Sequence, residues 1–126
     1  MDTFSKTTTK DFNLFKTECG YWVEKFGLND WRVNLDIGEV AGFATAEIYF
    51  IERFCHIVLS DELPDVNREK TIIETAFHEV FDGIVLAEIR TIAKNRDFDD
   101  DRLDSVCHGV LNRIQRLLLS TRRKDK

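Results

Sequence analysis

One histidine and two acidic residues lie close together in an apolar stretch of the chain. His78 and Glu79 are adjacent, and Asp82 follows four residues after His78. If the stretch is helical, His78 and Asp82 share one face, because residues four apart are neighbours on an α-helix. This is the spacing of the His-Glu-x-x-His signature, in which two histidines bind zinc and the glutamate is the general base. Asp82 stands at the position of the second histidine.

The three residues belong to a long predicted helix, from Asn67 to about Lys94, whose apolar residues recur at helical spacing. His78 and Asp82 are part of a polar row with one residue every four positions. Such a row is typical of a solvated face, with an ion pair between His78 and an acidic residue one turn away. Leu86 and Ile89, however, continue the same side of the helix as an apolar surface. This predicts that the polar residues lie in a partly closed cleft.

The pattern of the whole chain predicts an α+β domain with the element order α-β-β-β-α-α. Helical spacing or strand alternation is present in residues 10–26, 31–37, 43–51, 54–59, 67–94 and 99–121. Because short links join the three strands, we expect a three-stranded antiparallel sheet packed against the long central helix. Residues 1–9 are expected to be frayed, residues 10–121 to form one domain, and residues 122–126 to be a basic tail.

Composition argues against several classes of function. The 126 residues are 43% hydrophobic and include 10 Phe and 2 Trp, which is enough for a core. A net charge of −5 argues against nucleic-acid binding, because phosphate contacts need clustered Lys and Arg. The 3 cysteines have no close spacing, which favours a reducing cytoplasm over a disulfide framework. With neither a secretory signal nor an apolar run of membrane-spanning length, we expect a cytoplasmic protein without membrane contact.

The last predicted helix is expected to cover the site. Its apolar positions are Leu103, Val106, Cys107, Val110, Ile114, Leu117 and Leu118. Cys107 lies in the middle of this stripe, where a free cysteine is usually a small buried hydrophobe. His108 lies about 100° round the helix, on the flank. His56 follows Cys55 in a predicted strand, and its ordinary interpretation is an outward polar position.

These features together resemble the small zinc-metallopeptidase domains of phages and prophages, which are similar in outline to SprT-like proteins. The resemblance covers most of the chain and rests on residues 28–35, 41–46, 54–59, 74–82 and 107–114. It implies a zincin-like fold in which His78 is the first zinc ligand and Glu79 the catalytic base. Asp82 falls at the second histidine ligand, and Cys107 falls where an acidic third ligand is common. His108 is an alternative ligand.

Two of the three implied ligand positions therefore differ from the family pattern. Carboxylates bind zinc at about 2.0–2.2 Å and thiolates at about 2.3 Å, so neither change excludes a metal by itself. Aspartate is nevertheless shorter than histidine, and a site built for imidazole would not close on the same metal position. Loss at both positions is also what relaxed selection for zinc would produce.

Three hypotheses follow, of which we favour the first. The chain is a catalytically degenerate pseudo-enzyme that binds another protein, a host protein if it is phage-encoded, and acts as an inhibitor. Binding would use strand addition along the edge strand 43–51, with Phe43, Thr45, Glu47 and Tyr49 as contact residues. Alternatively, it is an active zinc metallopeptidase with Glu79 as base. In the third hypothesis it is a structural or assembly protein, and the motif is accidental.

Overall fold

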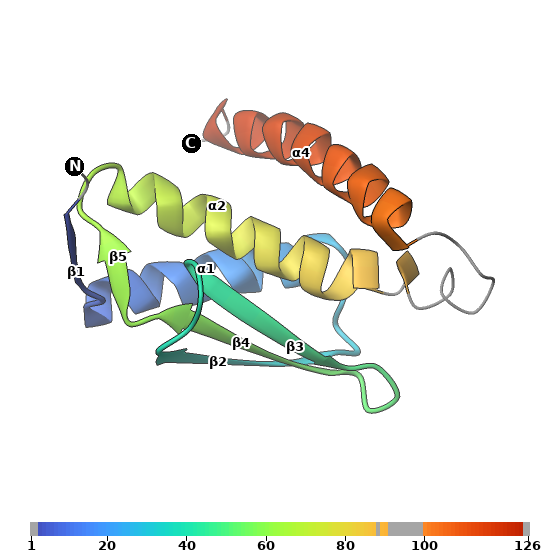
Figure 1. Ribbon diagram of the computed structural model, residues 1–126, viewed down its shortest axis with the longest axis horizontal. Helices are drawn as coiled ribbons and strands as arrows, with labels where there is room; N and C mark the ends of the chain where they lie inside the picture. Colours follow the sequence, from blue (N-terminus) through green and yellow to red (C-terminus); the bar gives the residue numbers. More distant parts are fainter. Residues whose placement is uncertain (1–2, 88, 91–99, 125–126) are drawn as a thin grey trace.

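The computed structural model describes residues 3–87, 89–90 and 100–124, with the backbone alone for residues 100–103 and 122–124, and the structural statements below concern these residues. They form an α+β fold with two small sheets (Figure 1). In chain order the elements are β1 (Phe4–Lys6), α1 (Thr9–Lys25), β2 (Arg32–Gly38), β3 (Ala44–Tyr49), β4 (Phe54–Ser60), β5 (Glu62–Pro64), α2 (Arg68–Val80), the π-helical segment η1 (Phe81–Val85) and α4 (Asp100–Lys124). In this described part of the chain, no helix is both long and apolar enough to cross a membrane.

The larger sheet has the strand order β2-β4-β3, and it is mixed. β2 pairs with β4 in parallel, from Arg32 opposite Phe54 to Gly38 opposite Ser60, whereas β3 pairs with β4 antiparallel. The prediction of a purely antiparallel sheet was therefore wrong. The central position belongs to the most apolar strand, β4, whose inward side chains Cys55, Ile57 and Leu59 are fully buried. The link of residues 39–43 passes to the far edge, so a short link did not make β2 and β3 neighbours.

The N-terminal residues form a second, two-stranded sheet that the sequence did not predict. β1 pairs antiparallel with β5, and Ser5 lies opposite Leu63. Residues 4–6 are therefore a strand rather than a frayed end. Strands of three residues carry too little alternation to be seen in a sequence, and their partners here lie far apart along the chain.

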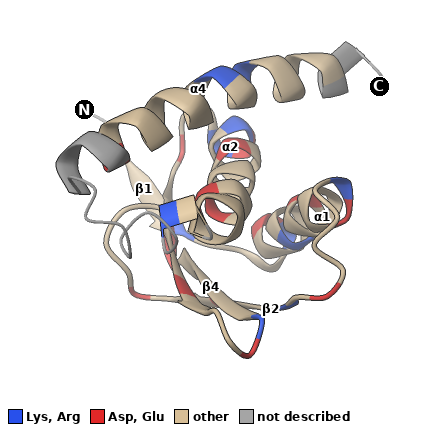
Figure 2. Cartoon of the chain, turned by 90° about the vertical axis from the view of Figure 1, so that its right-hand side faces the viewer, with Lys and Arg blue, Asp and Glu red and all other residues tan. Residues whose placement is uncertain are grey.

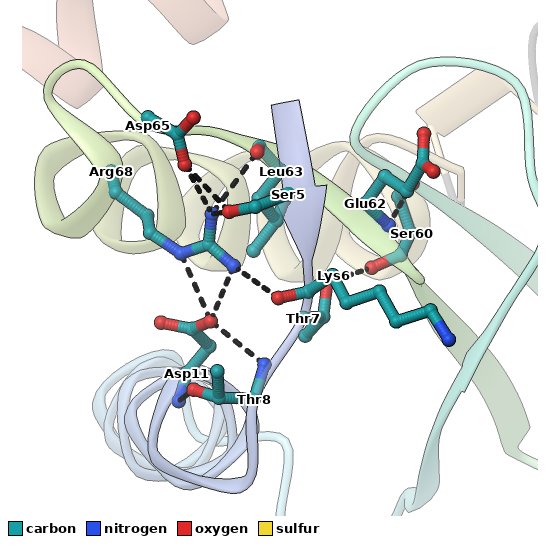
Figure 3. A network of polar contacts seen from close by, with 10 residues as sticks. All are labelled: Ser5, Lys6, Thr7, Thr8, Asp11, Ser60, Glu62, Leu63, Asp65 and Arg68. Carbon is teal, nitrogen blue, oxygen red and sulfur yellow. Dashed lines mark hydrogen bonds and ion pairs between the residues drawn. The ribbon is translucent and has the colours of Figure 1, made fainter. Parts of the chain in front are cut away.

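The guanidinium group of Arg68 connects the small sheet with the first turns of two helices (Figure 3). Its Nε and Nη2 atoms donate to Oδ2 of Asp11 at 2.9 and 2.7 Å. Nη1 donates to the carbonyl oxygen of Leu63, and Nη2 to that of Lys6. Asp11 also completes a capping box with Thr8 at the start of α1. The hydrogen bond from Arg68 lowers the pKa of Asp11, so the carboxylate is held in its charged form.

Both α1 and α2 pack on one face of the larger sheet, and α4 lies beyond α2 (Figure 2). The helix predicted for residues 10–26 is confirmed as α1. Aromatic rings join the two packed helices: Trp22 of α1 meets Phe77 of α2 edge to face, with ring centroids 4.9 Å apart. Their buried faces and that of β4 make one apolar core.

The central helix changes its winding near the candidate site. It is α-helical as far as Val80 and continues as the π-helical segment η1, so the prediction of one regular helix was wrong at this point. Residues 91–94 of the predicted helix lie outside the described residues. Within η1, a Cβ atom on Gly83 would lie 2.9 Å from Cβ of Ala46 in β3. Glycine at this position therefore allows the close approach of β3 to the helix.

The last helix exposes several side chains that its pattern predicts to be buried. Cys107, Leu111 and Leu119 are buried, whereas Val106 is 58% and Leu117 66% exposed. The side chain of Leu103 lies outside the described residues. Helix α4 continues to Lys124, so part of the predicted basic tail is helical, and residues 125–126 are outside the described part. A single helix cannot bury a face wider than the surface it rests on.

The contact between Gly83 and Ala46 gives a stability prediction. Gly83→Ala is expected to lower the free energy of unfolding by about 1–3 kcal/mol, because the added methyl group pushes β3 away from η1. Urea denaturation followed by circular dichroism measures this change. The double variant Gly83→Ala/Ala46→Gly removes the clash and is expected to recover most of the loss.

The matched control is Gly109→Ala in α4, where a Cβ atom would meet nothing within 4 Å. This variant is expected to gain about 0.5–1 kcal/mol, because alanine favours a helix interior. A Gly83→Ala variant as stable as the wild type would show that β3 does not pack this closely.

Candidate functional site

His78 and Glu79 line an open cleft of about 420 Å³ between α2, α4 and the start of β3. The other lining residues are Phe43 and Ala44 at β3, Thr71, Glu74 and Thr75 of α2, and Asn112 and Gln115 of α4. The sequence pattern predicts His78, Glu79 and Asp82 in such a cleft. The first two line it, whereas Asp82 is not among its lining residues. Asn112 and Gln115 of α4 were not predicted to line the cleft, because the sequence pattern of this helix predicts contact only through its apolar positions.

Asp82 forms an ion pair with Arg90, a partner that was not predicted from the sequence. Nη1 of Arg90 donates to Oδ1 of Asp82 at 2.8 Å, and Nε donates to Oδ1 of Asp104 in α4 at 3.2 Å. The side chains of Arg90 and Asp82 are 19% and 25% exposed, so this ion pair is partly shielded from water. Arg90 follows Asp82 by eight residues, and most of the π-helical segment η1 lies between them, so regular helical spacing did not identify Arg90 as the partner.

His78 is half-buried, and its environment disfavours the imidazolium form. Burial lowers its pKa below the usual range, and the nearby charges of His108 and Arg90 act in the same direction. Asp82 opposes the shift, but its carboxylate is already engaged by Arg90. His78 is therefore neutral at pH 7 and offers the cleft one donor or acceptor nitrogen rather than a positive charge.

Glu79 is the most perturbed acid of the site. Burial raises its pKa to about 7, and the negative charge of Asp82 adds to the effect. Burial raises the pKa of Cys55 to about 11, and the nearby carboxylate of Glu79 adds to this shift. A glutamate that titrates near neutral pH can accept or release a proton, which is the property required of a general base.

The predicted zinc ligands do not form a metal-sized group. Cys107 is buried at 4% exposure, and His108 is exposed. Nowhere in residues 3–87, 89–90 and 104–121 do three His, Cys, Asp or Glu side chains lie close enough together to hold one ion. Oδ1 of Asp82 accepts a hydrogen bond from the guanidinium of Arg90, and this positive charge disfavours a second cation at the same carboxylate. The described residues thus do not present a complete zinc site.

β3 lies at an edge of the larger sheet, within the predicted edge strand 43–51. Each exposed side chain of Thr45, Glu47 and Tyr49 points to the sheet face opposite the helices, because alternate residues Ala44 and Ala46 face the cleft and η1. The hydroxyl of Tyr49 donates to Glu47 at 2.8 Å on that outer face. Phe43 precedes the strand and lines the cleft itself. His56 also faces outward and contacts Asp36 at 2.6 Å, as its ordinary interpretation predicts.

Among the described residues, the outer side of the β3 backbone is unpaired. The carbonyl oxygen of Phe43 accepts from the amide of Ser60, which makes these two residues a hydrogen-bonded antiparallel pair. Bonded pairs alternate along the ladder, so Ala44, Ala46 and Ile48 direct their N–H and C=O groups away from β4. No described strand pairs with this side of β3.

Comparison with known proteins does not assign the chain to a family: no family model matches it, and neither a curated protein nor a solved structure shows significant similarity. The zincin-like interpretation therefore stays a prediction from the sequence.

The shielded ion pair leads to a prediction about its strength. In a double-mutant cycle with Asp82→Asn and Arg90→Met, the coupling free energy is expected to be about 1–2 kcal/mol, because both side chains are partly buried. The control is Lys70 with Glu74, one turn apart on α2, 3.8 Å apart and 58% and 38% exposed. That pair is expected to couple by about 0.3–0.5 kcal/mol. Equal coupling in the two cycles would contradict the assigned geometry.

The raised pKa of Glu79 leads to a prediction about pH. The folded state keeps the proton up to about pH 7, whereas the unfolded chain releases it near the ordinary value of 4.5. The unfolded state therefore binds fewer protons between these values, and stability falls as the pH rises from about 4.5 to 7. Glu79→Gln removes this loss, so its stability relative to the wild type should improve by about 2–3 kcal/mol between pH 5 and pH 8.

Chemical denaturation of both proteins at the two pH values measures this difference. Glu69→Gln is the control, because Glu69 is an exposed acid in the first turn of the same helix. If the wild type and Glu79→Gln respond equally to pH, Glu79 is ionised in the folded state well below neutral pH.

Proposed function

We propose that the chain is a protein-binding pseudo-enzyme on a zincin-like scaffold, with a former metal site that no longer acts in catalysis. The ion pair between Asp82 and Arg90 is the observation that carries this proposal. It satisfies the carboxylate at the second ligand position with a fixed internal cation. Glu79 and His78 remain in the cleft. The positive charge beside Asp82, however, comes from Arg90, and a guanidinium group cannot act as the Lewis acid that activates water in a metallopeptidase.

The outer edge of β3, which no described strand pairs with, supports binding of an extended protein segment. Ala44, Ala46 and Ile48 offer a row of outward backbone donors and acceptors beside the cleft. Such an edge is a template for an added strand, in which main-chain hydrogen bonds give affinity and neighbouring pockets give specificity. The resemblance to phage domains makes a host protein the proposed partner, and inhibition of that partner the proposed effect.

A displayed library of random short peptides tests this function directly. Peptides selected on the wild type are expected to bind Ala46→Pro about tenfold or more weakly, because proline removes an outward N–H group and blocks strand addition. Proline is tolerated where an edge-strand N–H faces solvent, so β3 should stay paired with β4. Thermal unfolding of the variant checks that the fold is intact.

The matched control is Asn34→Ala, which changes an exposed side chain of β2 at the other edge of the same sheet and leaves β3 unchanged. Its peptide affinities should equal those of the wild type. Binding is also expected to be the same with EDTA and with added zinc chloride, and mass spectrometry should find the peptides intact. Zinc-dependent cleavage, or peptides indifferent to Ala46→Pro, would overturn the proposal.

A further inference from the structure

The cleft opens beside one particular position of the β3 edge. Ala44 lines the cleft and also directs its backbone groups outward. Residues paired across adjacent strands send their side chains to the same face of a sheet. In a segment added to β3, the residue opposite Ala44 would therefore direct its side chain toward α2 and into the cleft.

The walls of the cleft are suited to a positive charge. Its lining includes the carboxylates of Glu74 and Glu79, together with hydroxyl, amide and imidazole groups, and it contains no lysine or arginine among the described residues. Glu79 forms no hydrogen bond or ion pair with the described residues. Glu74 has only a distant ion pair within that part of the chain, with its Oε1 atom 3.8 Å from Nζ of the exposed Lys70.

Arg90, the arginine whose charge reaches His78, is engaged by Asp82 and Asp104. His78 itself is half-buried, and it faces the cleft as a hydrogen-bonding group. An anionic side chain would meet two carboxylates, and a large apolar one would leave Glu79 buried without a partner.

We propose that the cleft is a specificity pocket for a lysine or arginine side chain of an extended protein segment, bound opposite Ala44 with its cation between Glu74 and Glu79. This inference rests on the proposed strand addition at β3 and names the class of segment that is accepted. The long aliphatic stem of lysine or arginine crosses the apolar rim at Phe43 and Ala44, and the charged end reaches the acids.

Peptide selection on the wild type and on Glu74→Gln/Glu79→Gln tests the pocket. Peptides selected on the wild type are expected to share one lysine or arginine. Replacing a shared lysine by norleucine keeps the stem and removes the charge. It should raise Kd about tenfold to hundredfold for the wild type, the range expected when a hydrogen-bonded charge is lost. For the double glutamine variant, the two peptides should bind equally well.

The control is Glu24→Gln/Glu69→Gln, which removes the same number of charges from exposed positions outside the cleft and should keep the preference for lysine. Binders that depend on the β3 edge but show no basic preference would overturn the pocket and leave the strand-addition function standing. A basic preference that persists in Glu74→Gln/Glu79→Gln would also overturn it. Failure to select any edge-dependent peptide would overturn both. The norleucine comparison on the wild type needs no variant to fold.

Discussion

Four segments of the chain meet at the guanidinium group of Arg68, and the position of the cleft depends on this junction. Arg68 is 18% exposed and Asp11 13%, so a mostly buried charge pair is balanced by hydrogen bonds to the carbonyl groups of Leu63 and Lys6. A pair of this kind is stable only when its remaining donors are also satisfied, which requires β1, β5, α1 and α2 in one arrangement. The Arg68 junction thereby sets where α2 begins. His78 and Glu79 lie further along this helix.

The C-terminal continuation of α2, from η1 to Arg90, is held by two different contacts. The missing side chain of Gly83 lets the π-helical segment approach Ala46 of β3, while Arg90 connects Asp82 with Asp104 of α4. Steric contact sets the distance from the helix to the strand edge, and the Arg90–Asp104 ion pair adds to the apolar packing of Cys107 and Leu111 that holds α4. The cleft is thus bounded by elements held at both ends, which favours a preformed binding site over one that must be assembled around a ligand.

Sequence patterns identified those helices and strands in which one apolar face is buried and the other is exposed. Helix α1 and strands β2 to β4 were located because their periodicity extends over six or more residues. Pairing direction was not predictable, since parallel and antiparallel neighbours of a buried strand use the same alternation. Strand β1 and the Arg68 network depend on contacts between residues that are distant in the chain. The ion pair of Arg90 with Asp82 spans the π-helical segment, where regular α-helical spacing ends. The His78–Glu79 pair was identified by its chemistry, whereas its surroundings required the fold.

The environment of Glu79 bears most directly on why a carboxylate remains in the cleft. A buried acid without a described partner lowers the stability of the folded state at neutral pH, and a glutamine or an apolar residue would fill the same space at less cost. The acid is therefore not explained by folding. In a metallopeptidase its cost is offset by catalysis, but here Arg90 satisfies the neighbouring Asp82 and the described residues hold no metal-sized group. A cationic ligand group would remove the cost of burial at the moment of binding, so the same carboxylate that destabilises the free protein would favour the complex.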